Sequence, residues 1–320
     1  MVAKRYGSPD VLRLEEVERP TPEDGGACVE VRAASVNAAD WHVLRADPPL
    51  VRLMGFGLLR PKNLILGGDV AGRVLSVGEN VTLFEPGDEV LGDLSNCGFG
   101  AFAEYVCVPE DTLVHKPSNL TFEEAAAVPL AGITALQGLR MGGIQRGQRV
   151  LITGASGGVG TFAVQIAKSF GTEVTGVCST EKVDLVRSLG ADDVVDYERE
   201  DFTDAEGRYD LLLDAGGYRS IRDSRRALRR DGNHVFVGGS TARVFEAMLI
   251  GPLLSMGDGP TVHSLMAEPN RGDLIDLSEL IGAGNVTPAI DRRFSLEEVP
   301  DAIRYLEAGK ARGKVVVAVR

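Results

Sequence analysis

The sequence predicts an α/β protein in which a mostly β N-terminal region precedes a doubly wound, parallel, six-stranded sheet. Short β-type runs punctuated by glycine and proline fill residues 1–118. From about residue 121 onward strands alternate with helical stretches, a pattern typical of a parallel sheet covered by helices. With 320 residues, the chain is long enough for two domains that each have a core, or for one large domain.

Composition and charge exclude several classes of protein. The chain is 44% hydrophobic and 25% charged, carries a net charge of −12, and contains no apolar run of the about 18 residues that a membrane span needs. A large acidic excess disfavours nucleic acid and anionic membranes as partners, because positive charge dominates binding to both. The first residues lack the apolar core of a signal peptide, so we expect a cytoplasmic protein.

The four cysteines, Cys28, Cys97, Cys107 and Cys178, form neither a CxxC motif nor a disulfide framework. Cys97 and Cys107 are near enough in sequence to face each other, but no neighbouring residues supply the other ligands of a zinc site. We therefore expect four reduced cysteines.

Two helix starts and a final strand are marked by local signals. Thr121 to Glu124 and Ser295 to Glu298 both have the pattern of a capping box, in which the first and fourth residues satisfy each other's backbone N–H groups. The second box is predicted to open a helix that continues to about Ala308. The apolar run that starts at Gly313 then predicts a closing strand.

A glycine-rich turn, Gly154 to Gly160, lies between a short buried strand and an amphipathic helix that Gly171 can terminate. Its last six residues nearly match GxGxxG, with alanine in place of the first glycine. A backbone without side chains lets a pyrophosphate approach, and the positive end of the helix receives its charge. The sequence therefore predicts a dinucleotide bound at Ala155, Ser156, Gly157, Gly158 and Val159. The alternative is a tight turn required only for helix–sheet packing.

The loops after the later strands are predicted to form walls of the same groove. Ligands of such sheets bind beyond the carboxyl ends of the strands. Residues 214–217 follow the fourth predicted strand, and residues 237–240 follow the fifth. We therefore expect Val237 and Gly238 to contact the cofactor.

The end of the second strand favours NADP(H) over NAD(H). An NAD site usually places an acidic residue there, about 20 residues after the glycine motif, to bind the ribose. This chain instead has Ser179, Thr180 and Lys182, whose hydroxyls and positive charge suit a 2′-phosphate. Glu181 opposes this assignment, because a carboxylate repels a phosphate. The alternative is that Ser179 or Thr180 caps the next helix and that Lys182 is solvated.

Several motifs, in order along the chain, resemble the medium-chain dehydrogenase/reductase superfamily. They are NAAD at Asn37, GGDVAGRVLSVG at Gly67, PGDEV at Pro86, FAEYVCVP at Phe102, AAAVPLAGITA at Ala125, GASGGVG at Gly154, GAD at Gly190 and GKVVV at Gly313. The resemblance implies a GroES-like β barrel formed by residues 1–120 and 286–320, and a Rossmann domain formed by residues 121–285. It also implies a homodimer.

The resemblance further points to the zinc-free quinone oxidoreductase branch. Zinc-dependent members have cysteine at the position of Asn37, His-Glu at Gly68-Asp69 and a third ligand near Leu130, so this chain lacks the ligand set for catalytic zinc. In the zinc-free branch, a lysine and a tyrosine matching Lys182 and Tyr197 hold the NADPH ribose phosphate.

A further residue of the nucleotide-binding region, Thr134, is expected to touch the nicotinamide. Thr134 has an alternative role inside a helix, and Tyr197 has one as an exposed aromatic at a strand end.

Without a Lewis acid the alkoxide formed from a simple ketone would lack stabilisation, whereas a quinone or α,β-unsaturated carbonyl spreads the charge by delocalisation. We therefore expect a quinone or enone substrate. Asn37 and Asp40 are the candidate catalytic residues, Asn37 bonding a carbonyl or ribose hydroxyl and Asp40 orienting Asn37 or a water. Trp41 and His42 are candidate pocket residues, with core packing and an exposed loop position as the respective alternatives.

Two apolar segments have open interpretations. Residues 47–63 are interpreted as a lid over an apolar substrate or as a buried connection, and residues 245–259 as a border of the substrate cleft, an oligomer interface or core. Two other functions remain open at this point. One is a reductase with a single biosynthetic or alcohol substrate, and the other is an NADPH-binding sensor without turnover.

Overall fold

The computed structural model describes residues 1–319 except 54–55, 63, 240–242, 244–245, 248, 250, 252–253 and 256–258. The chain divides into two compact units. The first comprises residues 1–131, 269–282 and 288–320, and the second comprises residues 132–268 and 283–287. None of the helices in the described part of the chain is both long enough and apolar enough to cross a bilayer.

A seven-stranded sheet forms the centre of the first unit. Its order is β14-β15-β3-β4-β5-β7, with β6 also paired to β3. The bounds are Gly26–Val36 for β3, Asp69–Val77 for β4, Glu89–Asp93 for β5, Tyr105–Pro109 for β6, Leu113–His115 for β7, Ile290–Ser295 for β14 and Lys314–Ala318 for β15. The first half of β3 pairs with β6 and its second half with β15. The last strand of the chain therefore lies in the same sheet as strands from its first third, as the family resemblance implies.

Helices of the first unit begin at the predicted capping boxes. The Thr121 Oγ1 atom accepts from the Glu124 N–H at 3.2 Å, and the Glu124 carboxylate accepts from the Thr121 N–H at 2.8 Å, so α2 (Phe122–Ala126) starts there. The Ser295 N–H donates to the Glu298 carboxylate at 2.8 Å, just before α9 (Val299–Glu307). Both predicted helix starts are confirmed.

Helix α8 (Arg271–Gly282) belongs to the first unit, although the sequence analysis grouped its residues with the nucleotide-binding region. The Asn119 side chain donates to the Ile281 carbonyl oxygen at 3.0 Å. Leu274, Leu277 and Ile281 are buried on one face of the helix. This division therefore differs from the predicted boundaries at residues 120 and 286, because helix packing is not a local property of the sequence.

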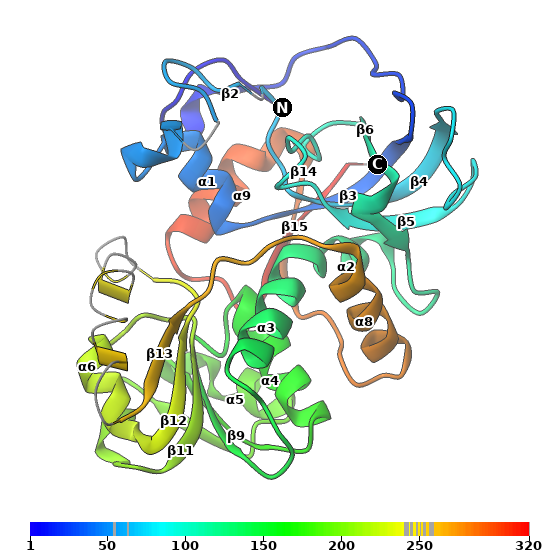
Figure 1. The fold of residues 1–320 in the computed structure, drawn as a ribbon. Helices are drawn as coiled ribbons and strands as arrows, with labels where there is room; N and C mark the ends of the chain where they lie inside the picture. The colour runs from blue at the N-terminus through cyan, green and yellow to red at the C-terminus, as the bar shows by residue number, and fades with distance from the viewer. Residues whose placement is uncertain are drawn as a thin grey trace. The chain divides into compact units, whose positions relative to one another are not determined.

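The second unit contains a parallel six-stranded sheet of order β10-β9-β8-β11-β12-β13, which confirms the predicted doubly wound fold. The strands are β8 (Arg149–Thr153), β9 (Glu173–Cys178), β10 (Asp193–Asp196), β11 (Tyr209–Asp214), β12 (Leu228–Phe236) and β13 (Thr261–Ser264). The connecting helices include α3 (Pro129–Met141), α4 (Gly158–Ser169), α5 (Val183–Ser188) and α6 (Ile221–Ser224) (Figure 1). The strand order reverses direction at β8, so the fold places its ligand crevice beyond the carboxyl end of that strand.

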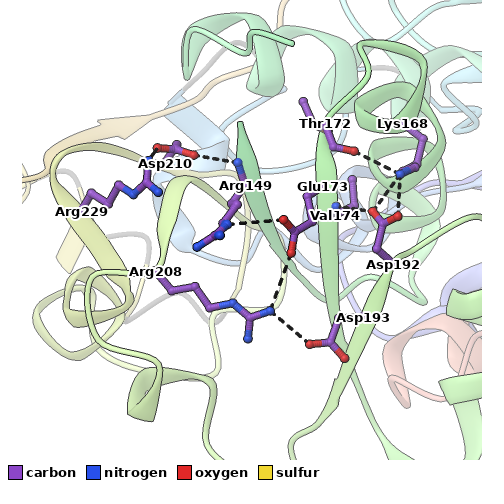
Figure 2. Close-up of polar contacts among 10 residues, drawn as sticks. All are labelled: Arg149, Lys168, Thr172, Glu173, Val174, Asp192, Asp193, Arg208, Asp210 and Arg229. Carbon is purple, nitrogen blue, oxygen red and sulfur yellow. Dashed lines mark hydrogen bonds and ion pairs between the residues drawn. The ribbon is translucent and has the colours of Figure 1, made fainter. Parts of the chain in front are cut away.

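The amino ends of these strands carry a chain of alternating charges (Figure 2). The Glu173 carboxylate lies 3.4 Å from Arg149 Nε and 3.9 Å from Arg208, which also pairs with Asp193 at 3.4 Å. These groups are well exposed, so each pair contributes little to stability. The ion pairs lie at the opposite edge of the sheet from the glycine-rich turn, so they leave the carboxyl edge clear for a ligand.

Candidate functional site

The glycine-rich turn joins β8 to α4 in the second unit. Gly154 has a φ of +64°, which favours glycine. A Cβ atom added at Gly160 would lie 2.1 Å from the Gly154 carbonyl oxygen and 2.7 Å from the Ala155 Cα, so only glycine permits this approach of helix to turn. These two positions fix the shape of the turn.

The N-terminus of α4 fits a pyrophosphate. Helix geometry leaves the N–H groups of Gly158, Val159 and Gly160 without partners inside the helix. Gly157 at the N-cap makes no side-chain cap, and the first turn contains no acidic residue. Because the helix dipole adds positive potential at this end, an anionic ligand is stabilised here.

Two of the predicted turn residues are largely enclosed. The Ala155 N–H donates to the Val177 carbonyl oxygen at 3.1 Å, and its side chain is fully buried. Ala155 therefore anchors the turn onto β9, and its N–H is not available to a ligand. Ser156 is also buried, with only 5% of its surface exposed.

The loop after β11 meets the glycine-rich turn at this edge, and the loop after β12 meets the loop after β11. A Cβ added at Gly154 would lie 3.0 Å from the Gly216 nitrogen, and one added at Gly217 would lie 3.0 Å from the Gly239 Cα. The Val237 N–H donates to the Asp214 carbonyl oxygen at 2.9 Å. Nothing lies within 4 Å of the position that a Cβ on Gly238 would occupy, so this residue borders open space.

Asp214 fastens the first of these loops. Its carboxylate accepts from the Thr153 hydroxyl at 2.5 Å and from the Gly217 N–H at 2.9 Å, and it lies 3.3 Å from His234 Nε2. Burial raises the pKa of Asp214, but its contacts with His234, Thr153 and Gly217 outweigh burial and lower it overall. The sequence analysis missed this anchor, although polar residues at the ends of two buried strands were a visible signal.

The end of β9 brings together three of the predicted phosphate-binding residues, Ser179, Thr180 and Lys182, and two acids. Ser179 and Lys182 are buried, at 7% and 9% exposed, and the Ser179 side chain caps no helix. The Thr180 hydroxyl donates to Asp196 at 2.5 Å and to Glu198 at 2.9 Å. The alternative interpretation, in which the Lys182 side chain is solvated, therefore does not hold. The two acids escaped the sequence analysis, because only the pairing of β9 with β10 brings them to this position.

An aromatic pair lies at the same edge of the sheet. Tyr197 is 40% exposed, and the centroid of its ring lies 4.7 Å from that of Tyr218. Both rings border a hollow of about 250 Å³ that is also lined by Glu200, Asp201, Phe202 and Arg219. Thr134, by contrast, is buried within α3.

In the first unit, Asn37 and Asp40 stand where β3 ends and α1 (Ala38–Arg45) begins. The Asp40 carboxylate accepts from the Asn37 N–H at 2.8 Å and from the Gly67 N–H at 3.1 Å. Asp40 is fully buried, and burial, with a smaller contribution from the charge of Asp69, raises its pKa to about 7. Asp40 therefore holds the Asn37 backbone and does not face solvent.

The Asn37 side chain belongs to a buried ion-pair network that the sequence analysis missed. Lys314 Nζ donates to Asn37 Oδ1 at 2.5 Å and lies 3.2 Å from Asp69 Oδ2. The Asn37 amide nitrogen donates to the same Asp69 oxygen at 2.8 Å. Asp69 and Lys314 each begin a strand that pairs with β3, so the register of the sheet assembles the network.

The two predicted pocket residues do not join this network. The Trp41 and His42 rings stack with centroids 3.6 Å apart, and both side chains are half-buried. Trp41 packs against the core of the first unit, and His42 Nδ1 lies 2.6 Å from the Asp47 carbonyl oxygen. The predicted apolar segments, 47–63 and 245–259, lie partly outside the described residues. Among the described residues, no group of three or more His, Cys, Asp or Glu side chains is arranged to hold a metal ion.

Comparison with known proteins identifies the family. Residues 23–118 match the family described as "Alcohol dehydrogenase GroES-like domain", and residues 189–317 match "Zinc-binding dehydrogenase". A 2-methylene-furan-3-one reductase of Solanum lycopersicum is 35% identical over 98% of this chain and 76% of its own length. The chain belongs to the medium-chain dehydrogenase/reductase superfamily, in its quinone oxidoreductase-like branch.

Two further similarities support this assignment. The chloroplastic NADPH-dependent alkenal/one oxidoreductase of Arabidopsis thaliana is 33% identical over 98% of this chain and 77% of its own length. The structure of a quinone oxidoreductase from Coxiella burnetii superposes with a TM-score of 0.88 at 30% identity, covering 100% of this chain and 98% of that one. The protein is therefore an oxidoreductase that uses a nicotinamide cofactor.

Two glycine variants separate the shape of the turn from contact with the cofactor. Gly160→Ala forces a Cβ into the turn, so we expect a loss of about 1–3 kcal/mol in unfolding free energy and weakened binding of the nicotinamide cofactor. Gly238→Ala enters the open space that the cofactor is expected to fill, so the melting temperature should stay unchanged while the Kd for the cofactor rises about tenfold. Thermal melts and fluorescence titrations with NADPH measure both effects. A Gly238→Ala protein that binds NADPH normally would remove Gly238 from the cofactor site.

Asp93, the last residue of β5, makes the stability of the first unit depend on pH. Burial and then the charge of Asp69 raise its pKa to about 7. Between pH of about 4 and 7 the folded protein retains a proton that the unfolded chain releases, so the free energy of unfolding falls as the pH rises. Asp93→Asn should flatten this dependence by up to about 1.4 kcal/mol per pH unit.

Urea unfolding followed by the fluorescence of Trp41, the only tryptophan of the chain, reports on this unit. The exposed Glu79→Gln variant is the matched control. Parallel pH profiles for Asp93→Asn and the unaltered protein would contradict the assignment.

Proposed function

We propose that the protein is an NADPH-dependent, zinc-independent reductase that transfers hydride to a quinone or an α,β-unsaturated carbonyl compound. The observation that carries this proposal is the buried network of Asn37, Asp69 and Lys314. Two of its residues, Asn37 and Asp69, stand at positions that match zinc-site motif residues of the zinc-dependent members.

The donor set at these positions does not suit zinc. Asp69 Oδ1 accepts from the Leu130 N–H at 2.9 Å, and Oδ2 accepts from Ser35, Asn37 and Lys314. The carboxylate is thus already occupied by four donors, and the Lys314 ammonium supplies the positive charge that a metal would bring. Asn37 and Gly68 replace a cysteine and a histidine, so the ligands needed for catalytic zinc are missing.

The second unit supplies the groups for NADPH. The first turn of α4 is suited to the pyrophosphate, and Ser179, Lys182 and Tyr197 are suited to the ribose 2′-phosphate. The carboxylates of Asp196 and Glu198 oppose the phosphate, and the Thr180 hydroxyl is engaged by them. Lys182 therefore provides the positive charge that favours NADPH over NADH. When bound, the cofactor supplies the hydride.

Asn37 is suited to bind the substrate carbonyl. One of its two amide hydrogens goes to Asp69, which leaves the second for a ligand. Lys314 donates to Asn37 Oδ1, and this polarises the amide and strengthens its remaining N–H as a donor. A single neutral donor is adequate for a substrate that delocalises negative charge, such as a quinone or enone, and inadequate for a simple ketone.

The names of the relatives agree with this substrate class. They include a 2-methylene-furan-3-one reductase, an alkenal/one oxidoreductase and a quinone oxidoreductase. We also propose a homodimer, which light scattering of the purified protein tests.

The proposed reaction predicts a specific pattern of substrates. NADPH oxidation, followed at saturating chelator, should proceed with an o-quinone, a p-quinone, an enal or an enone and should fail with a saturated aldehyde. Loss of activity on chelation would contradict the metal-free site. Silence across the whole panel with NADPH still bound would favour a narrow substrate or a sensor.

The choice of cofactor is predicted to depend on Lys182. Lys182→Ala should raise the KM for NADPH about tenfold and leave the KM for NADH nearly unchanged, because only NADPH carries the 2′-phosphate. Initial rates with a single acceptor measure both constants, and the exposed Lys310→Ala variant is the control. Equal increases for the two cofactors would show that Lys182 acts on the fold and not on the phosphate.

A further inference from the structure

Two cysteines of the first unit lie directly opposite each other on neighbouring strands. Cys28 on β3 pairs with Cys107 on the antiparallel strand β6, with no irregularity along this ladder. The sequence analysis left open that Cys97 faces Cys107, and this is wrong. Cys97 lies in the turn after β5, where its sulfur faces the Leu94 carbonyl oxygen at 3.5 Å.

The backbone pattern places this pair at a position where side chains come close. The Val31 N–H donates to the Glu104 carbonyl oxygen, and the Glu110 N–H donates to the Gly25 carbonyl oxygen. Hydrogen-bonded and non-hydrogen-bonded positions alternate along an antiparallel ladder, so Cys28 occupies a non-hydrogen-bonded position. Directly opposite Cα atoms there are only about 4.5 Å apart. This separation lies within the range of about 4.4–6.8 Å that a disulfide spans.

The two thiols are in contact and one of them can be reached from solvent. Burial, together with a hydrogen bond to the Cys28 thiol, raises the pKa of Cys107. Cys28 is buried behind it, with its sulfur 3.7 Å from the Pro20 carbonyl oxygen. Cys107 is half-buried and lines a hollow of about 260 Å³ that is bordered by residues 20–21 and 23–26. A small disulfide can therefore approach Cys107 first.

We propose that Cys28 and Cys107 form a reversible redox site that low-molecular-weight disulfides oxidise to an intramolecular disulfide. The Cys107 thiolate attacks one sulfur of glutathione disulfide and releases one glutathione thiol. The Cys28 thiolate then attacks the Cys107 sulfur of the mixed disulfide and releases the second. The two protein thiols lose two electrons and two protons, which reduce one glutathione disulfide to two glutathione thiols.

The cysteine pair and the buried network of Asn37, Asp69 and Lys314 are connected through strand β3. Cys28 and Ser35 belong to the same strand, and Ser35 donates to Asp69 at 2.5 Å. Oxidation adds a covalent link between β3 and β6 without breaking a backbone hydrogen bond, because the pair is non-hydrogen-bonded. The short Cα separation lies near the lower limit for a disulfide, which favours ready reduction by a dithiol.

The test uses the whole, natively folded protein and glutathione disulfide as the probe. After incubation at pH 7 and pH 9, intact mass and non-reducing peptide maps identify the cysteines that have reacted. We expect a Cys28–Cys107 cross-linked peptide, formed faster at pH 9 because the thiolate is the attacking species, and removed by dithiothreitol. Free thiols should fall from four to two.

Four single cysteine-to-serine variants identify which thiols form the cross-link. Cys107→Ser and Cys28→Ser should each abolish the cross-link, and Cys97→Ser and Cys178→Ser should leave it intact. Because Cys107 is half-buried, Cys107→Ser tests the proposal even if the buried Cys28→Ser variant does not fold. A stable glutathione adduct on Cys107 without a cross-link would overturn the proposal. So would a cross-link to Cys97 or Cys178, or no loss of thiols at either pH.

Discussion

Lys314 and Asp69 form an ion pair in a place from which water is excluded, and the arrangement of the first unit depends on it. The two residues are 245 positions apart in the chain, and their side chains are 2% and 0% exposed. Removing two charges from water costs several kcal/mol for each ion, so such a pair persists only when every remaining donor and acceptor is satisfied. The hydroxyl of Ser35, the amide of Asn37 and the N–H of Leu130 complete it.

The buried Lys314–Asp69 ion pair influences both the arrangement of the strands and the position of Asn37. The network needs β15 and β4 on opposite sides of β3, so it requires the C-terminal strand to return to the N-terminal sheet. It also fixes the amide plane of Asn37 through two of its polar atoms, while Asp40 fixes the backbone of the same residue. A donor held in this way loses little entropy when it binds a carbonyl. In the proposed reaction, this single neutral donor suits acceptors that delocalise negative charge.

Features with local signals could be predicted from the sequence alone. The turn at Gly154, the capping boxes at Thr121 and Ser295, and the parallel sheet of six strands all follow from spacing, propensity and the alternation of elements. The positions of Ser179 and Lys182 at the end of β9 follow in the same way. These signals are contained within a few residues, so no knowledge of strand register is needed to find them.

Features that depend on register could not be predicted. Asp69 and Lys314 meet only because their strands pair with β3 in a particular alignment, and the same is true of Cys28 and Cys107. The acids that engage Thr180 reach β9 through its pairing with β10. Ala155 matched a cofactor-binding motif, yet its N–H serves the sheet. In each case a long-range pairing, absent from the local pattern, decides what a side chain or N–H group contacts.

The most direct test of the account is the behaviour of Asn37→Ala in turnover and in cofactor binding. The measurement compares kcat with a p-quinone and the Kd for NADPH in the unaltered and variant proteins. Loss of the donor to the substrate carbonyl predicts a fall in kcat of about 10²-fold or more, with NADPH affinity nearly constant. An unchanged kcat, or a collapse of NADPH affinity, would contradict the role assigned to Asn37 and to the ion pair that holds it.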